Sequence, residues 1–105
     1  MALNFHHIAV QVNDISEVVE WYKSNLGATV INQFDDWAMM EIGGLRLSLT
    51  LKNHPNHIAF EVENVDQFPC NPEEVKAHRD GSLFYYQEAP DGTIIEWLYW
   101  PAAKP

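Results

Sequence analysis

Alternating apolar residues predict that residues 5–12 form a β-strand. Successive side chains of a strand point to opposite faces, so the apolar ones share a single face: Ile8, Val10 and Val12. The other face carries small and polar side chains, a pattern suited to lining a cavity: His7, Ala9 and Gln11. We expect the apolar face to pack under the helix that follows in the same half of the chain.

A helix is predicted directly after this strand. Asp14 stands three residues before Glu17, a spacing typical of a helix N-cap, and Gly27 supplies the C-terminal stop. The apolar residues between them recur at helical spacing: Ile15, Val18, Val19, Tyr22 and Leu26. This segment is therefore expected to be one continuous helix.

Three short extended runs complete the first half, over residues 28–34, 37–42 and 45–51. Asp35-Asp36 and Gly43-Gly44 separate them as turns. In the last run, inward-facing leucines alternate with polar residues on the opposite face: Arg46, Ser48 and Thr50. The first half is thus predicted to be β-α-β-β-β.

The second half follows the same plan with a shorter helix. Asn64 is placed to cap a short helical turn over residues 65–68, but Pro69 and Pro72 interrupt any longer helix. Residues 73–78 fit either a small helix or a weak strand. Strands are predicted over three further segments: 57–62, 83–87 and 93–99.

The two halves repeat one another in sequence. His7-Ile8-Ala9-Val10-Gln11-Val12 matches His57-Ile58-Ala59-Phe60-Glu61-Val62 fifty residues later. Gly44-Leu45-Arg46-Leu47-Ser48 matches Gly92-Thr93-Ile94-Ile95-Glu96, which puts Ser48 and Glu96 at equivalent places. Self-similarity of this kind indicates repeated supersecondary units. We therefore expect a single domain over residues 1–105, built from two modules: 1–52 and 53–105.

Composition narrows the function classes. The formal net charge of −9 repels polyphosphate, so binding to nucleic acid or to an anionic membrane surface is not expected, whereas cations are attracted. No window is long and apolar enough to cross a bilayer, and a signal-peptide pattern is absent. Cys70 is the single cysteine, which excludes an internal disulfide. The cytoplasm is the expected location.

His7, His57 and Glu96 are candidate metal ligands. Glu96 shares its strand face with Ile94 and Leu98, where a carboxylate is costly to bury unless it is paired or bound to metal. Taken singly, each of the three residues is more often structural, but the repeat brings them to related strand positions. Two imidazoles and a carboxylate suit one divalent metal ion, Fe, Mn, Ni or Zn, and the lack of thiolates argues against a structural zinc site.

The chain resembles the vicinal oxygen chelate superfamily, which includes glyoxalase I, extradiol dioxygenases, fosfomycin-resistance transferases and bleomycin-resistance proteins. The resemblance covers nearly the whole chain and rests on four matches: His7-Ile8-Ala9-Val10 with Asp14, the helix ending at Leu26-Gly27, His57-Ile58-Ala59-Phe60, and Ala89-Pro90-Asp91-Gly92-Thr93-Ile94-Ile95-Glu96. It implies an α+β fold in which two pseudo-symmetric βαβββ modules form a curled mixed sheet around a metal-binding cavity. It also implies that the divalent ion is bound by His7, His57 and Glu96.

The chain departs from parts of the superfamily pattern. Ser48 stands where glyoxalase I-type members carry an acidic ligand, which leaves a three-ligand site as in the dioxygenase and fosfomycin branches. The acid-base residues of ring-cleaving dioxygenases have only candidates by residue type: His54, His78, Tyr85 and Tyr86. Substrate contacts are predicted for three residues: Arg46, Ser48 and Tyr86.

Two function classes remain open. The first is a divalent-metal-dependent enzyme, of lyase, isomerase or dioxygenase type, that acts on a small oxygen-chelating substrate. The alternative is a metal-free, bleomycin-resistance-like protein that sequesters a cationic small molecule through its acidic charge and its four tryptophans. A third reading is an interaction subunit that uses Trp21 and the cluster of Trp97 and Trp100. A homodimer is expected in each case, because small sheets leave edges to cover.

Overall fold

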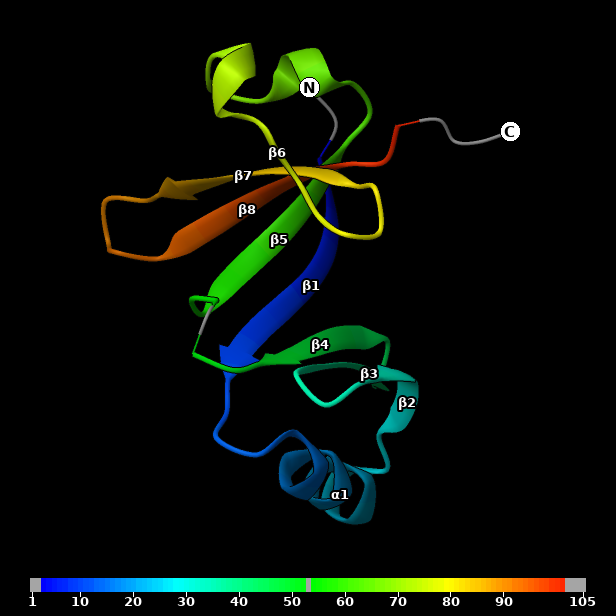
Figure 1. Cartoon of the computed structure of the whole chain (residues 1–105). Helices are drawn as coiled ribbons and strands as arrows, with labels where there is room; N and C mark the ends of the chain where they lie inside the picture. Colours follow the sequence, from blue (N-terminus) through cyan, green and yellow to red (C-terminus); the bar gives the residue numbers. More distant parts are fainter. Residues whose placement is uncertain (1–2, 53, 102–105) are drawn as a thin grey trace. The chain divides into compact units, whose positions relative to one another are not determined.

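The structure of the protein is a computed structural model that describes residues 3–52 and 54–101. These residues form eight β-strands, one α-helix and two short 3₁₀ helices (Figure 1). In chain order the elements are β1 (Leu3–Gln11), α1 (Ile15–Leu26), β2 (Thr29–Gln33), β3 (Trp37–Ile42), β4 (Leu45–Thr50), β5 (His57–Val62), η1 (Val65–Gln67), η2 (Pro72–Glu74), β6 (Lys76–Ala77), β7 (Leu83–Glu88) and β8 (Ile94–Tyr99). The predicted α+β class with a mixed sheet is confirmed.

The predicted elements agree closely with those observed. β3 and β5 match their predicted ranges residue for residue, and the other predicted strands shift by one or two residues at their ends. The undecided stretch 73–78 contains both alternatives, because η2 is followed by β6. No helix among the described residues is long and apolar enough to cross a membrane.

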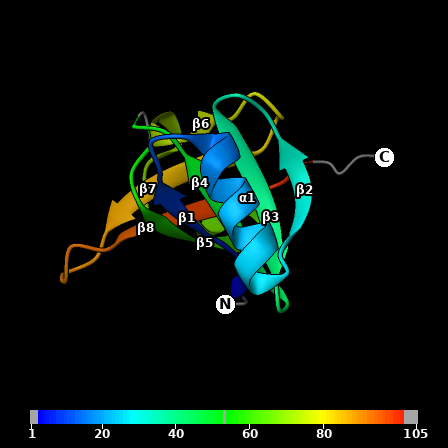
Figure 2. The same ribbon diagram turned by 90° about the horizontal axis from the view of Figure 1, so that it is seen from below.

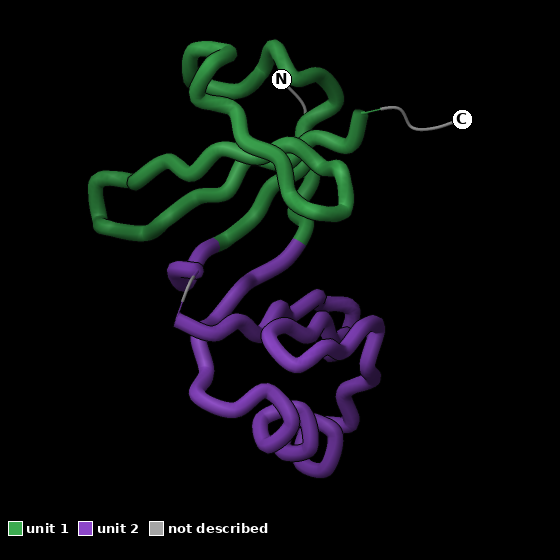
Figure 3. The backbone as a smooth tube through the Cα atoms, viewed as in Figure 1, with its two compact units in different colours: residues 1–6, 58–105 green, residues 7–57 purple. Residues whose placement is uncertain are grey.

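The chain divides into two compact units (Figure 3). Unit 2 comprises residues 7–57, and unit 1 comprises residues 1–6 together with residues 58–105. The single-domain organisation over 1–105 stays a prediction. Asn53, where the second module is predicted to begin, lies outside the described residues.

Unit 2 is a β-α-β-β-β arrangement with the strand order β2-β3-β4-β1. β1 runs parallel to β4, with Ala9 opposite Ser48, whereas β3 is antiparallel to both β2 and β4. This register confirms the predicted strand phase, because His7 and Ala9 share one face of the sheet with Ser48. The opposite face of the same strands is free to pack against α1.

Helix α1 begins and ends as predicted. The side-chain Oδ1 of Asp14 accepts a hydrogen bond from the Glu17 backbone N–H at 3.0 Å. Gly27 closes the helix in the left-handed conformation, at φ 65°, which costs a glycine little. α1 lies alongside β3 (Figure 2). Its buried side chains join a core that spans the helix and the strands: Ile15, Val19, Ala28, Ala38, Met40, Leu47 and Leu49.

Unit 1 has the strand order β5-β8-β7-β6, with β7 and β8 forming an antiparallel hairpin. In place of an α-helix it carries η1 and η2. Asn64 caps η1 as predicted, accepting from the Asp66 N–H at 2.9 Å, and Pro72 opens η2. The buried core of this unit is a small cluster on its strands: Ala59, Phe84 and Leu98, with Tyr86 packed against it. The prolines thus shorten the helical part of the second module without disturbing its strands.

Candidate metal centre

Two predicted ligands meet in unit 2. His7 lies in β1 and His57 opens β5, and their Nε2 atoms are 3.3 Å apart. Both side chains are buried, with 7% and 6% of their surface exposed. The rings stand edge to face, with centroids 5.4 Å apart at 71°. The pairing of histidines inferred from the repeat is therefore present.

A backbone contact assigns the tautomer of the His57 ring. Its Nδ1 atom lies 2.8 Å from the Pro55 carbonyl oxygen. A carbonyl oxygen only accepts, so we assign the ring proton to Nδ1, which leaves a lone pair on Nε2. Histidine ligands are commonly held in this way, with one nitrogen donating to a carbonyl while the other binds metal.

The spacing of the two Nε2 atoms fits a shared cation. Imidazole nitrogens that bind one ion at about 2.0–2.1 Å lie roughly 3 Å from each other in tetrahedral or octahedral geometry. The observed separation of His7 and His57 is 3.3 Å. The donor chemistry and the spacing of this pair therefore suit a divalent ion.

Ser48, predicted to contact substrate, lies in the same unit. It is 2% exposed, and its Oγ accepts a hydrogen bond from Trp37 Nε1 at 2.7 Å. Phe34 stacks on the Trp37 ring, with centroids 5.9 Å apart, and so helps to hold the indole. The hydroxyl is thus tied to a neutral donor. Arg46, also predicted to contact substrate, is exposed and stands opposite Glu41 in the β3–β4 register.

The third predicted ligand, Glu96, lies in β8 of unit 1. It is 2% exposed, and its Oε2 atom is 2.7 Å from Nε2 of His78. Tyr86 stands opposite Glu96 in the β7–β8 register. Burial, and secondarily the Glu96 carboxylate, raises the pKa of the Tyr86 phenol well above its ordinary value. Tyr86 therefore stays protonated at neutral pH.

His78 is the residue whose place sequence reasoning did not find. It was a candidate by type alone, because it has no counterpart in the repeat and follows a stretch of undecided structure. Its ring stacks on Phe84 with centroids 3.8 Å apart and planes 9° from parallel. Tyr85, by contrast, alternates with Tyr86 and stands opposite Trp97. His54 lies between β4 and β5, where its backbone N–H donates to the Leu51 carbonyl at 3.2 Å.

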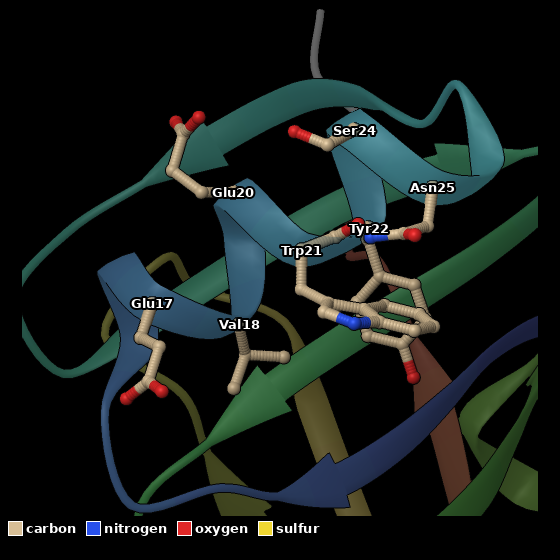
Figure 4. Close-up of a pocket in the computed structure, with 7 residues that line it drawn as sticks. All are labelled: Glu17, Val18, Glu20, Trp21, Tyr22, Ser24 and Asn25. Atoms are coloured by element: carbon tan, nitrogen blue, oxygen red, sulfur yellow. Dashed lines mark hydrogen bonds between the residues drawn. The ribbon is translucent and has the colours of Figure 1, made fainter.

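A shallow depression lies elsewhere in unit 2, on the outer surface of α1 (Figure 4). Seven residues of the helix line it: Glu17, Val18, Glu20, Trp21, Tyr22, Ser24 and Asn25. The Trp21 ring is exposed, as expected from the sequence, and meets the Tyr22 ring edge to face at 5.2 Å. None of the predicted site residues lines this depression.

Comparison with known proteins identifies relatives of the whole chain. The family model of the Glyoxalase/Bleomycin resistance protein/Dioxygenase superfamily matches residues 4–105. No curated protein matches the chain.

Solved structures share the fold at low sequence identity. A hypothetical protein from Bacillus halodurans, BH1468, superimposes with a TM-score of 0.76 at 15% identity, over 100% of this chain and 99% of its own. The methylmalonyl-CoA epimerase of Streptomyces coelicolor, in complex with 2-nitronate-propionyl-CoA, gives a TM-score of 0.72 at 19% identity, over 96% and 100%. That of Mycobacterium tuberculosis gives 0.69 at 19%, over 94% and 88%. At these identities the likeness concerns the fold alone.

Proposed function

The chain belongs to the Glyoxalase/Bleomycin resistance protein/Dioxygenase superfamily, and on this premise we propose that it is a divalent-metal-dependent enzyme acting on a small oxygen-chelating substrate. We propose that His7, His57 and Glu96 hold the ion. Each is buried and offers one ligand atom of a type that divalent metals accept. The observation that carries the proposal is the histidine pair, with its 3.3 Å spacing and a tautomer set by Pro55.

An Fe, Mn, Ni or Zn ion held by these residues would supply Lewis acidity toward an oxygen of the substrate. The residues of the chain would do the rest. Tyr86, which stands opposite Glu96 in the β7–β8 register, would donate a hydrogen bond from its phenol to a substrate oxygen that gains negative charge. Ser48, whose hydroxyl accepts from Trp37, would offer an uncharged polar contact to the substrate. Arg46, at the surface, suits an anionic end of the substrate.

The reaction is proposed as lyase, isomerase or dioxygenase chemistry. Two of the compared structures are methylmalonyl-CoA epimerases, so proton transfer next to a carbonyl is the first activity to assay. An iron-dependent uptake of dioxygen would instead favour the dioxygenase branch.

Metal analysis tests the proposal directly. The protein, reconstituted separately with Fe, Mn, Ni and Zn, is expected to bind close to one ion per chain with each metal that fits. His57→Ala removes one imidazole and should abolish this binding. His6→Ala is the matched control, because His6 is the neighbouring histidine on β1 but has the opposite strand phase. Failure of the wild-type protein to hold any of the four metals would reject the proposal.

The alternative function is a metal-free binding protein for a cationic small molecule, and the net charge of −9 favours it. Calorimetry of metal-free protein with a bleomycin-type ligand separates the two functions. Binding that is unchanged in His57→Ala supports the binding protein. The absence of heat at high micromolar ligand counts against it.

A homodimer is proposed as the working assembly. β2 is an edge strand of unit 2, and all five of its residues are exposed. Its apolar side chains continue into Phe34, which is 55% exposed. An open, apolar edge of this kind is usually covered in a soluble protein. Sedimentation equilibrium measures the assembly, and Ile31→Lys on this edge should shift it toward the monomer.

A further inference from the structure

We propose that His78 is a positioning residue that holds the carboxyl group of Glu96 in one orientation toward the divalent ion. This inference rests on the proposed function and assigns a role to a residue that the histidine repeat does not include. It starts from the contact between Nε2 of His78 and Oε2 of Glu96, which is 2.7 Å long. Glu96 is almost fully buried, whereas the His78 side chain is 28% exposed.

The contact ties one carboxylate oxygen to a donor of fixed position. A carboxylate has about four lone-pair sites, so a ring N–H that donates to Oε2 orients the group without preventing it from binding an ion. A buried carboxylate has little water to replace this bond if it rotates. His78 should therefore select one orientation of the Glu96 carboxyl group.

The surroundings of His78 hold its ring in place. The ring lies flat on Phe84, with centroids 3.8 Å apart. The His78 backbone N–H donates to the Ser82 carbonyl at 2.8 Å, and the Gly81 N–H donates to the His78 carbonyl at 2.9 Å. Asp80 closes the same loop, because its Oδ1 accepts from both the N–H and the hydroxyl of Ser82. A residue that hydrogen-bonds to a metal ligand can orient that ligand because it is itself held in place before the ion binds.

A purely structural role for His78 is the competing explanation, since a buried carboxylate needs a partner with or without metal. The two roles differ in what they change. A structural partner affects folding of the metal-free protein, whereas a positioning residue also sets the affinity and the geometry of the ion. The test therefore measures the ion itself.

Mn²⁺ affinity is measured by calorimetry in the wild type and in three variants. His78→Ala removes ring and donor, His78→Phe keeps a ring to stack on Phe84 but has no donor, and His78→Gln keeps an N–H donor. We expect the Ala and Phe variants to lose about 10–100-fold in Mn²⁺ affinity, which is the usual cost of removing a residue that hydrogen-bonds to a metal ligand. The Gln variant should recover most of this affinity. Absorption spectra of Co²⁺-loaded proteins should change in the Ala and Phe variants, reporting altered ligand geometry.

Each outcome decides the matter. Affinity in His78→Ala that equals or exceeds that of the wild type would overturn the inference and leave the proposed function standing. A Gln variant as weak as the Ala variant, when the unloaded proteins melt at similar temperatures, would also overturn it. A wild-type protein that binds no metal would overturn the proposed function and this inference together.

Discussion

The two units have the same kind of four-stranded arrangement but differ greatly in the helices that accompany it. Unit 2 carries α1, twelve residues long, and its core contains seven buried residues. Unit 1 carries two 3₁₀ helices of three residues each, and its buried core cluster contains three residues. The candidate ligands are nevertheless buried in both units. Strands alone therefore suffice to bury a candidate ligand, while the helix adds apolar burial.

The equivalent positions Ser48 and Glu96 also differ between the units, in the hydrogen-bond partners of their side chains. Both are buried on a strand of their own unit, and each has a side-chain hydrogen-bond partner. Ser48 accepts from the neutral Trp37 indole, whereas Glu96 is held by the titratable His78. Of the two, only Glu96 has an ionisable side chain, which is the kind that a divalent cation favours as a ligand.

The sharpest test of the comparison is the loss of a core leucine in each unit. Leu49→Ala should lower the free energy of unfolding toward the upper end of about 2–5 kcal/mol, because Leu49 is enclosed by the larger core. Leu98→Ala should cost less within that range, because the smaller cluster can relax around the gap. Chemical denaturation of both variants measures the difference.

An exposed leucine controls for side-chain loss without a cavity. Leu26, at the end of α1, is 53% exposed, and Leu26→Ala should change stability by only about 0.5 kcal/mol. If Leu98→Ala proves as costly as Leu49→Ala, helical cover does not set the difference between the units.

A smaller effect is expected from the two N-caps. Asp14→Ala removes the bond to the Glu17 N–H and should cost about 1 kcal/mol, since it leaves a donor of a three-turn helix without its cap. Asn64→Ala frees the N–H of Asp66 in a single turn and should cost less. Thermal unfolding ranks the variants, and Asp14→Asn, which keeps a capping oxygen, serves as the control. Equal losses would mean that the short η1 turn is as important to unit 1 as α1 is to unit 2.

These elements also show how far sequence alone predicts the fold. α1 was predictable to the residue, because its apolar spacing lies between a capping Asp14 and a terminating Gly27. η2 and β6 were not, since Pro72 forbids a long helix without saying which short structure replaces it. Alternation predicted the strand phase, and the register confirms it by placing Ala9 opposite Ser48.

For the candidate site, the sequence repeat predicted the candidate ligands but not the residues that contact them. Side-chain partners such as Pro55 for His57, or Trp37 for Ser48, depend on loop paths and on register across strands, which single-sequence patterns do not specify. His78 reaches Glu96 from a loop, without any periodic signal. The residues that contact the candidate ligands are therefore found in the structure, whereas the candidate ligands themselves were predicted from the sequence.

The smallest expected effect concerns the hairpin turns of the two units. The β3–β4 turn of unit 2 relies on Gly43 and Gly44, both at positive φ, and has no titratable group at its centre. In unit 1, the β7–β8 turn places Oδ1 of Asp91 3.0 Å from the Thr93 N–H, and this hydrogen bond lowers the pKa of the Asp91 carboxyl below 3.8. A carboxyl group whose pKa is lower in the folded state stabilises the protein at pH values above its pKa in the unfolded state. This stabilisation is lost as the pH falls through the pKa of the folded state. Asp91→Asn should therefore be slightly less stable than the wild type at neutral pH, and the difference should vanish in strong acid. Melting curves of both proteins at the two pH values measure this difference in stability, and NMR follows the titration midpoint of Asp91. A midpoint above 3.8 would show that the turn of unit 1 is no more sensitive to acid than that of unit 2.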